Sequence, residues 1–292
     1  MMNPAPLPLN LADDIVRRCI AEDLGTVGDI TAQTTLAEGL RAKAAVVARQ
    51  DGCIAGLAVA MRVFALLEAD VTVTPHVSDG AAVTRGAVLA TVAGAARDIV
   101  TGERSALNIL SHASGVATAT REMVSLIADL PTKLVDTRKT TPGLRALEKY
   151  AVRVGGGHNH RFGLFDVVLI KDNHIAATGS ITAAVEGARA ALGHTIKIEV
   201  EIDRLDQLAE AFSVGADVVM LDNMSITDMK TAVKRTGGAV TLEASGGVTR
   251  DNIRAIAETG VDVISVGWLT HSAPALDIAF DLTLDVTDRA RV

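Results

Sequence analysis

From residue 133 onward the chain repeats one pattern: a short apolar segment, a cluster of polar residues, and a stretch with helical spacing. We expect strands at 133–137, 166–172, 196–202, 217–223, 240–246 and 262–268. They are rich in Val and Ile and mostly apolar on both faces, as buried parallel strands are. Strands that alternate with helices build βαβ units with right-handed crossovers. Six strands fall short of the eight in a complete barrel. The pattern therefore predicts an α/β fold, either an incomplete parallel α/β barrel or an open doubly wound sheet.

The expected helices of this part follow residues that suit a helix start. One begins after Pro142, and the others follow Ser180, Asp203, Ser225 and Thr249, whose side chains can cap a helix N-terminus.

The first hundred residues have a different rhythm and predict a small α+β domain. Helical spacing runs over 11–24 and stops at Gly25, and a second helix is expected at 57–67. Strands are expected at 42–49, 70–77 and 87–94, and a long helical segment at 98–130, interrupted near Gly115. We place the first domain at 1–115, with 275–292 packing back on it, and the barrel at 116–274.

Composition excludes several classes of protein. Lys and Arg total 28 against 35 Asp and Glu, a net charge of −7, and aromatics are one Trp, one Tyr and five Phe. A nucleic-acid binder is expected to be basic or to offer stacking aromatics, so no nucleic-acid partner is expected. Two cysteines, Cys19 and Cys53, do not make a disulfide scaffold and favour a reducing compartment. Without a recognisable signal peptide or a long apolar run, we expect a cytoplasmic protein with no membrane span.

Polar residues follow the carboxyl end of each predicted strand. They are Thr137-Arg138-Lys139, Lys171, Glu199 with Glu201, Asp222-Asn223, Ser245-Gly246-Gly247 and Ser265-Val266-Gly267. In a parallel barrel these ends open onto one mouth, where barrel enzymes place their sites. Any one polar loop is ordinary, but the set as a whole predicts a functional site.

The cations in this set indicate the kind of ligand. Arg138, Lys139, Arg161 and Lys171, with His158 and His160, concentrate positive charge in an otherwise acidic protein. Arg presents a fork that matches carboxylate or phosphate, and Lys presents a point charge. A small polyanionic ligand is expected, although a surface salt bridge is the ordinary role of any single one of them.

Two further groups predict a metal and a phosphate. Glu201 and Asp222 either hold a divalent cation such as Mg²⁺ or neutralise Lys139 and Lys171, and the residues leave both alternatives open. Ser245-Gly246-Gly247, just before the helix expected after Thr249, leaves backbone N–H groups for a phosphate. Gly267 extends that surface, because barrel phosphate sites often follow the last two strands.

The chain resembles the quinolinate phosphoribosyltransferase family, also called nicotinate-nucleotide pyrophosphorylase (carboxylating). The segment TRKTTPGLRALEKYAVRVGGGHNHRFGLFDVVLIKDNH (137–174) carries most of the likeness. Further matching segments, in the expected order, are ERSALNILSHASGVAT (103–118), IEVEID (198–203), VMLDNM (219–224), LEASGGV (242–248) and SVGWLTHS (265–272). The resemblance implies an N-terminal α/β sandwich domain, an incomplete α/β barrel, and a homodimer in which each sandwich domain covers the partner's barrel mouth.

The resemblance also implies an activity and a set of site residues. Phosphoribosyl would pass from phosphoribosyl pyrophosphate to the nitrogen of quinolinate with loss of CO₂, giving nicotinate mononucleotide, a step of NAD biosynthesis. Catalysis would rest on Lys139, Lys171, Glu201 and Asp222, with Mg²⁺ held by the two carboxylates through phosphoribosyl pyrophosphate. Substrates would also contact Arg104 from the neighbouring subunit, and Thr137, Arg138, His160, Arg161, Ser245, Gly246, Gly247, Val266, Gly267 and Trp268. Trp268 departs from the small residue expected after Gly267, and it would narrow the phosphate end.

Three alternatives stay open at this point. A related phosphoribosyltransferase would act on another anionic heterocycle. A Schiff-base aldolase would use Lys171 as its nucleophile. A phosphosugar-binding regulator would bind its ligand without turnover. The sequence has no G-x-G-x-x-G turn in a strand-to-helix context, no G-x-S-x-G elbow and no zinc-ligand spacing, so we expect no dinucleotide cofactor, hydrolase triad or structural zinc.

Overall fold

The computed structural model describes residues 4–284. Within it the chain forms two compact units, each built from separated segments. The first unit takes the described chain up to Arg121, Thr141–Gly156 and the chain from Ser272 on, and the second takes Glu122–Thr140 and Gly157–His271. The boundary predicted between 115 and 116 falls inside a helix that continues past both positions, and it stays a prediction. None of the described helices is long and apolar enough to cross a membrane.

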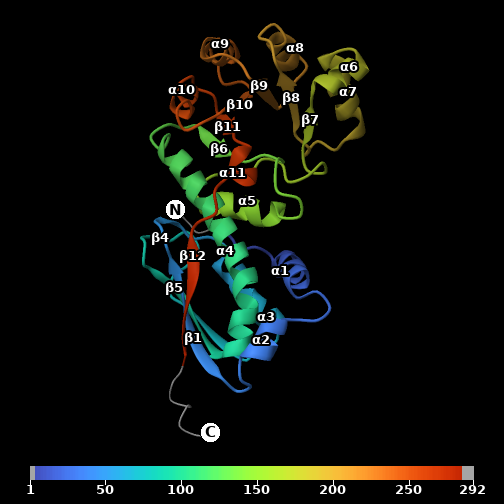
Figure 1. Ribbon diagram of the computed structural model, residues 1–292. Coiled ribbons are helices and arrows are strands. Elements are labelled where there is room, and N and C mark those ends of the chain that lie inside the picture. The colour runs from blue at the N-terminus through green and yellow to red at the C-terminus, as the bar shows by residue number, and fades with distance from the viewer. Residues whose placement is uncertain (1–3, 285–292) are drawn as a thin grey trace. The chain divides into compact units, whose positions relative to one another are not determined.

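The first unit packs helices against an antiparallel sheet of four strands in the order β12-β1-β5-β3 (Figure 1). Its last strand, β12, comes from the far end of the chain and pairs with β1 from Ala42↔Leu284 to Ala48↔Ile278. Residues 285–292 of the predicted C-terminal return lie outside the described residues. The elements are α1 (Leu9–Leu24), α2 (Ile30–Thr35), β1 (Arg41–Ala48), β2 (Gly52–Cys53), α3 (Leu57–Leu66), β3 (Val71–Pro75), β4 (Ala82–Val83), β5 (Val88–Ala95), α4 (Ala96–Ser125), α5 (Arg145–Val154) and β12 (Ile278–Leu284).

Two glycines in this unit show how the sequence sets element lengths. Helix α1 ends at Gly25, which has a positive φ of 52° and whose N–H donates to Ala21 O, so the predicted stop is confirmed. The interruption predicted near Gly115 is wrong, because α4 is one helix from Ala96 to Ser125. A Cβ at Gly115 would lie 2.2 Å from Pro274 O. The glycine therefore allows close approach of another chain segment and does not break the helix.

The second unit is a parallel sheet of six strands in the order β6-β11-β10-β9-β8-β7, with helices outside it (Figure 1). Its strands have the predicted sequence order with tighter bounds. The elements are β6 (Lys133–Val135), β7 (Val168–Ile170), α6 (Asp172–Thr178), α7 (Ile181–Ala191), β8 (Ile198–Ile202), α8 (Leu208–Ser213), β9 (Val218–Asp222), α9 (Ile226–Thr236), β10 (Thr241–Ser245), α10 (Ile253–Ala257), β11 (Val263–Ser265) and α11 (Trp268–His271).

The strand order decides between the two predicted architectures. From β7 to β11 each strand lies beside its predecessor, and the first strand, β6, then pairs with the last, β11. A doubly wound sheet instead reverses its direction at a switch point. In a barrel, successive strands are added in one direction until the last strand pairs with the first, as β11 does with β6 here. The sheet is not closed, because β6 and β7 remain its two edge strands. The incomplete α/β barrel is therefore confirmed.

Of the five predicted helix starts, three agree with the structure and two do not. The helix expected after Pro142 is α5, which begins at Arg145. Ser180 and Ser225 cap α7 and α9, accepting the N–H groups of Ala183 and Asp228. Asp203 and Thr249 do not cap a helix, because α8 and α10 begin later, after Gln207 and Asn252. Extra loop residues therefore follow β8 and β10 at the carboxyl edge of the sheet.

Candidate active site

A pocket of about 570 Å³ opens at the carboxyl ends of the parallel strands, entirely within the second unit. It is lined by most of the residues predicted for the site: Thr137, Arg138, Lys139, His160, Arg161, Lys171, Glu201, Asp222, Ser245, Gly246 and Gly247. A smaller pocket of about 240 Å³ shares part of this lining and adds Val266, Gly267 and Trp268. Side chains more than a hundred positions apart in sequence therefore meet at one edge of the sheet, as the strand-end argument predicts.

Among the substrate-binding and catalytic residues that the resemblance implies, Arg104 is the one that lies outside these pockets. Glu199 and His158, named in the wider polar set, do not line them either. Arg104 is exposed on α4 and belongs to the first unit. Within the described part of the chain it has neither a hydrogen bond nor an ion pair. Its predicted reach into a partner's site stays a prediction.

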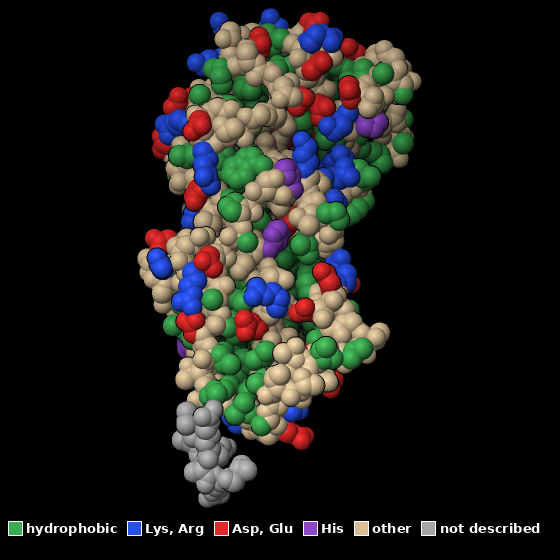
Figure 2. Space-filling model, viewed as in Figure 1, with side chains coloured by type: hydrophobic (Ala, Val, Ile, Leu, Met, Phe, Trp, Pro, Cys, Tyr) green, Lys and Arg blue, Asp and Glu red, His purple; other side chains and the backbone are tan. Residues whose placement is uncertain are grey.

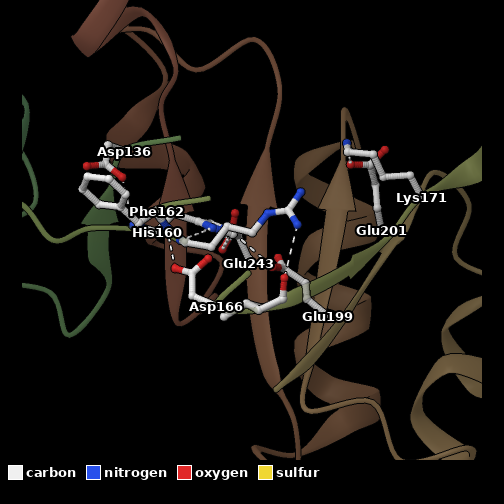
Figure 3. Close-up of polar contacts among 10 residues, drawn as sticks. Asp136, His160, Phe162, Asp166, Lys171, Glu199, Glu201 and Glu243 are labelled. Carbon is white, nitrogen blue, oxygen red and sulfur yellow. Dashed lines mark hydrogen bonds and ion pairs between the residues drawn. The ribbon is translucent and has the colours of Figure 1, made fainter. Parts of the chain in front are cut away.

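The half-buried carboxylates Glu201 and Asp222 line the pocket beside cations. Lys171 Nζ forms an ion pair with Glu201 Oε2, and the Glu201 side chain is 16% exposed (Figure 3). Asp222 accepts a hydrogen bond from the Asn223 amide at 2.9 Å. In this structure Glu201 thus neutralises Lys171, which was one of the two predicted alternatives. The two carboxylates remain hard oxygen donors on neighbouring strands, β8 and β9, which is a donor set that suits Mg²⁺ together with substrate phosphates.

A buried cluster of His160, Glu199 and Glu243 lies deeper in the same unit. His160 Nε2 is 3.1 Å from Glu199 Oε2 and 3.5 Å from Glu243 Oε2, and the two carboxylate side chains are only 3% and 4% exposed (Figure 3). Burial, reinforced by the neighbouring Glu199 charge, raises the pKa of Glu243 to about 7. Near neutral pH Glu243 is therefore partly protonated.

Local hydrogen bonds fix the orientation of His160. Its backbone N–H donates to Asp136 Oδ1 at 2.9 Å, and the neighbouring Asn159 amide donates to Asp136 Oδ2 at 2.6 Å. Its Nδ1 accepts the Arg161 N–H at 2.6 Å, so the ring proton lies on Nε2 and faces Glu199. Both ring nitrogens of His160 are thus engaged by the protein, and its predicted contact with substrate stays a prediction.

Arg161 is the cation next to this cluster. Burial lowers the pKa of Arg161, and the charge of Arg138 nearby lowers it further. One guanidinium nitrogen donates to Val167 O at 3.2 Å, which fixes the side chain in the pocket. Two neighbouring guanidinium groups that raise each other's electrostatic energy form a site that a bound dianion would stabilise.

The glycine loop Ser245–Val248 lines both pockets. The prediction that it precedes a helix directly is wrong, since α10 begins at Ile253. Gly246 and Gly247 instead take positive φ values of 92° and 60°. A Cβ at Gly246 would lie 2.1 Å from Asn223 Oδ1, so only glycine fits there. The free N–H groups of this loop follow from its own conformation.

Several residues of the site were not predicted from the sequence. Glu243 lines the larger pocket, and Asp136 holds the 159–160 segment. Glu199 was placed on the same face as Glu201 but given no role. A usable signal was present, because Asp136, Glu199 and Glu243 are carboxylates inside otherwise apolar strand segments, where an unpaired charge is costly.

Charge on the surface is mixed. On the face drawn in Figure 2, Lys and Arg side chains alternate with Asp and Glu. Because the protein as a whole carries a net charge of −7, the positive charge of the pocket acts only over a short range. It therefore favours a small anionic ligand over an extended polyanion.

Comparison with known proteins assigns both parts of the chain to one family. The family described as quinolinate phosphoribosyl transferase matches with its N-terminal domain at residues 29–114 and with its C-terminal domain at 116–281. A Bacillus subtilis protein named probable nicotinate-nucleotide pyrophosphorylase [carboxylating] is 49% identical over 263 residues, 90% of each chain. The Mycobacterium leprae protein of that name, without "probable", is 45% identical and covers 93% of this chain and 97% of its own.

Solved structures agree with the sequences. NadC from Streptococcus pyogenes superimposes with a TM-score of 0.92 at 39% identity, covering 96% of this chain and 99% of its own. The nicotinate-nucleotide pyrophosphorylase from Francisella tularensis gives a TM-score of 0.90 at 43% identity, with 96% and 98% covered. Because the likeness spans both units and includes the strand ends that line the pockets, this chain belongs to the quinolinate phosphoribosyltransferase family.

Proposed function

We propose that this protein transfers the phosphoribosyl group of phosphoribosyl pyrophosphate to the nitrogen of quinolinate, with loss of CO₂, to give nicotinate mononucleotide and pyrophosphate. The observation that carries the proposal is the single pocket of about 570 Å³ in which two arginines, two lysines and two accessible carboxylates meet. Membership of the family supports the choice of substrates.

Arg138 and Arg161 bind the two carboxylates of quinolinate. Both line the pocket, and their mutual repulsion is relieved when anions bind between them. The His160 ring accepts the backbone N–H of Arg161, and Val167 O accepts a hydrogen bond from its guanidinium, so Arg161 is held at both ends before the ligand arrives. A preoriented pair of planar forks aligns the pyridine nitrogen with its target carbon.

Phosphoribosyl pyrophosphate lies across the exposed side of the pocket. Lys139 and Lys171 stabilise the pyrophosphate, and the glycine loop takes the phosphate at the other end of the molecule. Glu201 and Asp222 would hold Mg²⁺ together with the substrate phosphates. That ion, when bound, supplies charge that lowers the energy of the leaving pyrophosphate.

Bond changes then follow from the placement of charge. The bond from ribosyl C1 to the pyrophosphate oxygen breaks, and its electron pair leaves with the pyrophosphate beside Lys139 and Lys171. Glu201 and Asp222 favour the positive charge that develops at C1. The pyridine nitrogen supplies the electron pair of the new C–N bond and becomes positive. The bond to the 2-carboxylate then breaks, CO₂ leaves, the electron pair stays on the ring beside the positive nitrogen, and the ring carbon takes up a proton.

A homodimer completes the proposal. Phe162, Leu164 and Phe165 are exposed on the second unit, while Leu9, Val27 and Ile30 are exposed on the first. Apolar side chains of this size favour an interface between copies of the chain. Arg104, exposed on α4, would be the residue that each subunit lends to its partner's pocket. Two free cysteines support placement in a reducing compartment such as the cytoplasm.

The reaction is tested with quinolinate labelled in its 2-carboxyl group. We expect labelled CO₂ to be released only when phosphoribosyl pyrophosphate and Mg²⁺ are both present. Release of no CO₂ while another heterocyclic acid is consumed would assign the protein to a related phosphoribosyltransferase. Ligand binding without any turnover would instead make it a regulator. A borohydride-trapped adduct on Lys171 would indicate an aldolase, which the ion pair with Glu201 disfavours because it already engages the amine.

Donation of Arg104 is tested by mixing two inactive variants. Arg104→Ala and Lys171→Ala each remove one part of every site, but a mixed dimer has one site with both residues intact. After subunit exchange we expect about a quarter of wild-type activity, because half the dimers are mixed and each has one complete site. If the mixture stays as inactive as its components, Arg104 does not act across the interface.

A further inference from the structure

Three carbonyl groups of the glycine loop accept hydrogen bonds from other residues. Ser245 O accepts the Asn223 N–H at 2.9 Å, and Gly247 O accepts the Asn252 amide at 2.9 Å. Val248 O accepts the indole N–H of Trp268 at 3.1 Å. These three donors come from three different places in the sequence, so the loop has little freedom to turn its peptide groups.

The N–H groups of the same loop are free. Within residues 4–284, the N–H groups of Gly246, Gly247 and Val248 donate to no protein acceptor. Consecutive residues at positive φ turn such N–H groups toward a common concave side, which is a recognised way to bind an anion. The loop is therefore arranged with its acceptors satisfied and its donors available.

Trp268 also forms part of the wall of the pocket that these N–H groups share. Its ring lines the pocket of about 240 Å³ together with Lys139 and His271. The Arg250 guanidinium lies 5.8 Å from the ring centroid in a cation–π arrangement, and Arg250 is itself ion-paired with Glu122. Trp268 is thus held by a polar contact at its edge and a charge over its face.

We propose that Trp268 is a positioning residue for the phosphate group of the substrate: its indole N–H fixes the Val248 peptide next to the free N–H groups of the glycine loop. This inference rests on the proposed function, because phosphoribosyl pyrophosphate is the ligand that brings the phosphate. Asn252 lies in the same connection as the loop that it holds, and Asn223 links that loop to the end of β9, whereas Trp268 links it to the end of β11. It therefore couples the last two strand ends into one phosphate site.

The kinetic test compares Trp268→Phe, which removes the N–H and keeps an aromatic ring, with Trp268→Ala, which removes both. For Trp268→Phe we expect the KM for phosphoribosyl pyrophosphate to rise about three- to tenfold, the effect of one lost hydrogen bond. The KM for quinolinate should stay within twofold, since its arginines line the other pocket. Trp268→Ala should raise the first KM further, and Arg250→Gln should raise it less. Phe212→Leu, which changes an exposed aromatic on α8, is the matched control.

A second test uses the wild-type protein, in which Trp268 is the only tryptophan. We expect ribose 5-phosphate alone to change the tryptophan fluorescence in a saturable way, and quinolinate alone to leave it unchanged. This measurement shows whether the phosphate end of the ligand binds beside Trp268, and it needs no Trp268 variant.

The outcomes separate this inference from the proposed function. An active wild type whose Trp268→Phe variant keeps its KM for phosphoribosyl pyrophosphate, or whose two KM values rise equally, would overturn the inference alone. So would a fluorescence that responds to quinolinate and not to ribose 5-phosphate. A wild type that neither binds nor turns over phosphoribosyl pyrophosphate would overturn both.

Discussion

Glu199 and Glu201 lie two residues apart on the same face of β8, yet their surroundings differ sharply. Glu201 is accessible from the pocket and pairs with Lys171, while Glu199 is buried and contacts His160. Each has a companion on a neighbouring part of the sheet, Asp222 beside Glu201 in the pocket and Glu243 near Glu199 in the buried cluster. One strand thus supplies a carboxylate to each of two groups at different depths.

Because the two pairs of carboxylates differ in burial, we expect them to have different functions. An accessible carboxylate next to a lysine can exchange that partner for a metal ion or a developing cation during a reaction. A buried carboxylate that contacts a histidine ring cannot follow such changes at low cost, and it serves to hold its neighbours in place. We therefore expect the Glu201 side to govern reaction rate and the buried side to govern stability and quinolinate binding.

The largest effect is expected for Glu201→Gln, which tests the role of the accessible carboxylates. The substitution keeps the size of the side chain but removes the charge that faces Lys171 and the reacting carbon. We expect kcat to fall by about 10²–10³-fold with a much smaller change in the KM for quinolinate, because stabilisation in the transition state is lost. Steady-state kinetics measure it. Glu186→Gln removes an exposed carboxylate from α7 of the same unit and serves as the control. A Glu201→Gln variant as fast as the control would remove the distinction between the two groups.

The next largest effect is expected for Glu243→Gln, and it is an effect on stability. Burial raises the pKa of Glu243 to about 7 from an ordinary value of 4.5. Between these values the folded state keeps a proton that the unfolded state releases, so wild-type stability falls as the pH rises through this range. Glutamine cannot ionise. The free energy of unfolding of the variant minus that of wild type should therefore grow by about 2–3 kcal/mol between pH 4.5 and pH 7.5.

Urea unfolding at a series of pH values measures this difference. Subtracting the two proteins removes the titration of all other groups, to the extent that they do not couple to Glu243. Glu186→Gln should show a difference that does not change with pH. If the difference for Glu243→Gln is also independent of pH, the pKa of Glu243 is not raised in the folded protein.

The fold could be read from the sequence because each of its rules is local. Val- and Ile-rich strands that alternate with helices predict parallel βαβ units, in a barrel or a doubly wound sheet, and Gly25 marks a helix end through its own backbone conformation. Gly115 misled the prediction because its role depends on Pro274, a residue more than 150 positions away. The break in the barrel between β6 and β7 likewise follows from pairing between distant strands and not from any local signal.

The site could be predicted only as far as strand ends converge. Parallel topology brings Arg138, Lys171 and Asp222 together whatever the details of packing. The partners of these residues depend on side-chain depth, which periodicity does not report. That is why Glu201 was left undecided between a metal and a lysine, and why Glu243 was missed. The carbonyl contact of Trp268 is also invisible in the sequence, because it joins two loops through backbone geometry.

Arg138→Lys should have the smallest effect of the three substitutions. It tests whether the arginines near the buried cluster govern quinolinate binding. Lysine keeps the charge but loses the planar fork that matches a carboxylate. We expect the KM for quinolinate to rise about tenfold, as for one lost charge-assisted hydrogen bond, while kcat and the KM for phosphoribosyl pyrophosphate change little. If kcat falls instead, Arg138 acts on the reacting bonds and belongs with Glu201. If only the KM for quinolinate increases, the two arginines act with the buried cluster in binding quinolinate. The contacts link them: the His160 ring contacts Glu199 and accepts the backbone N–H of Arg161. The charge of Arg161 in turn lies near that of Arg138.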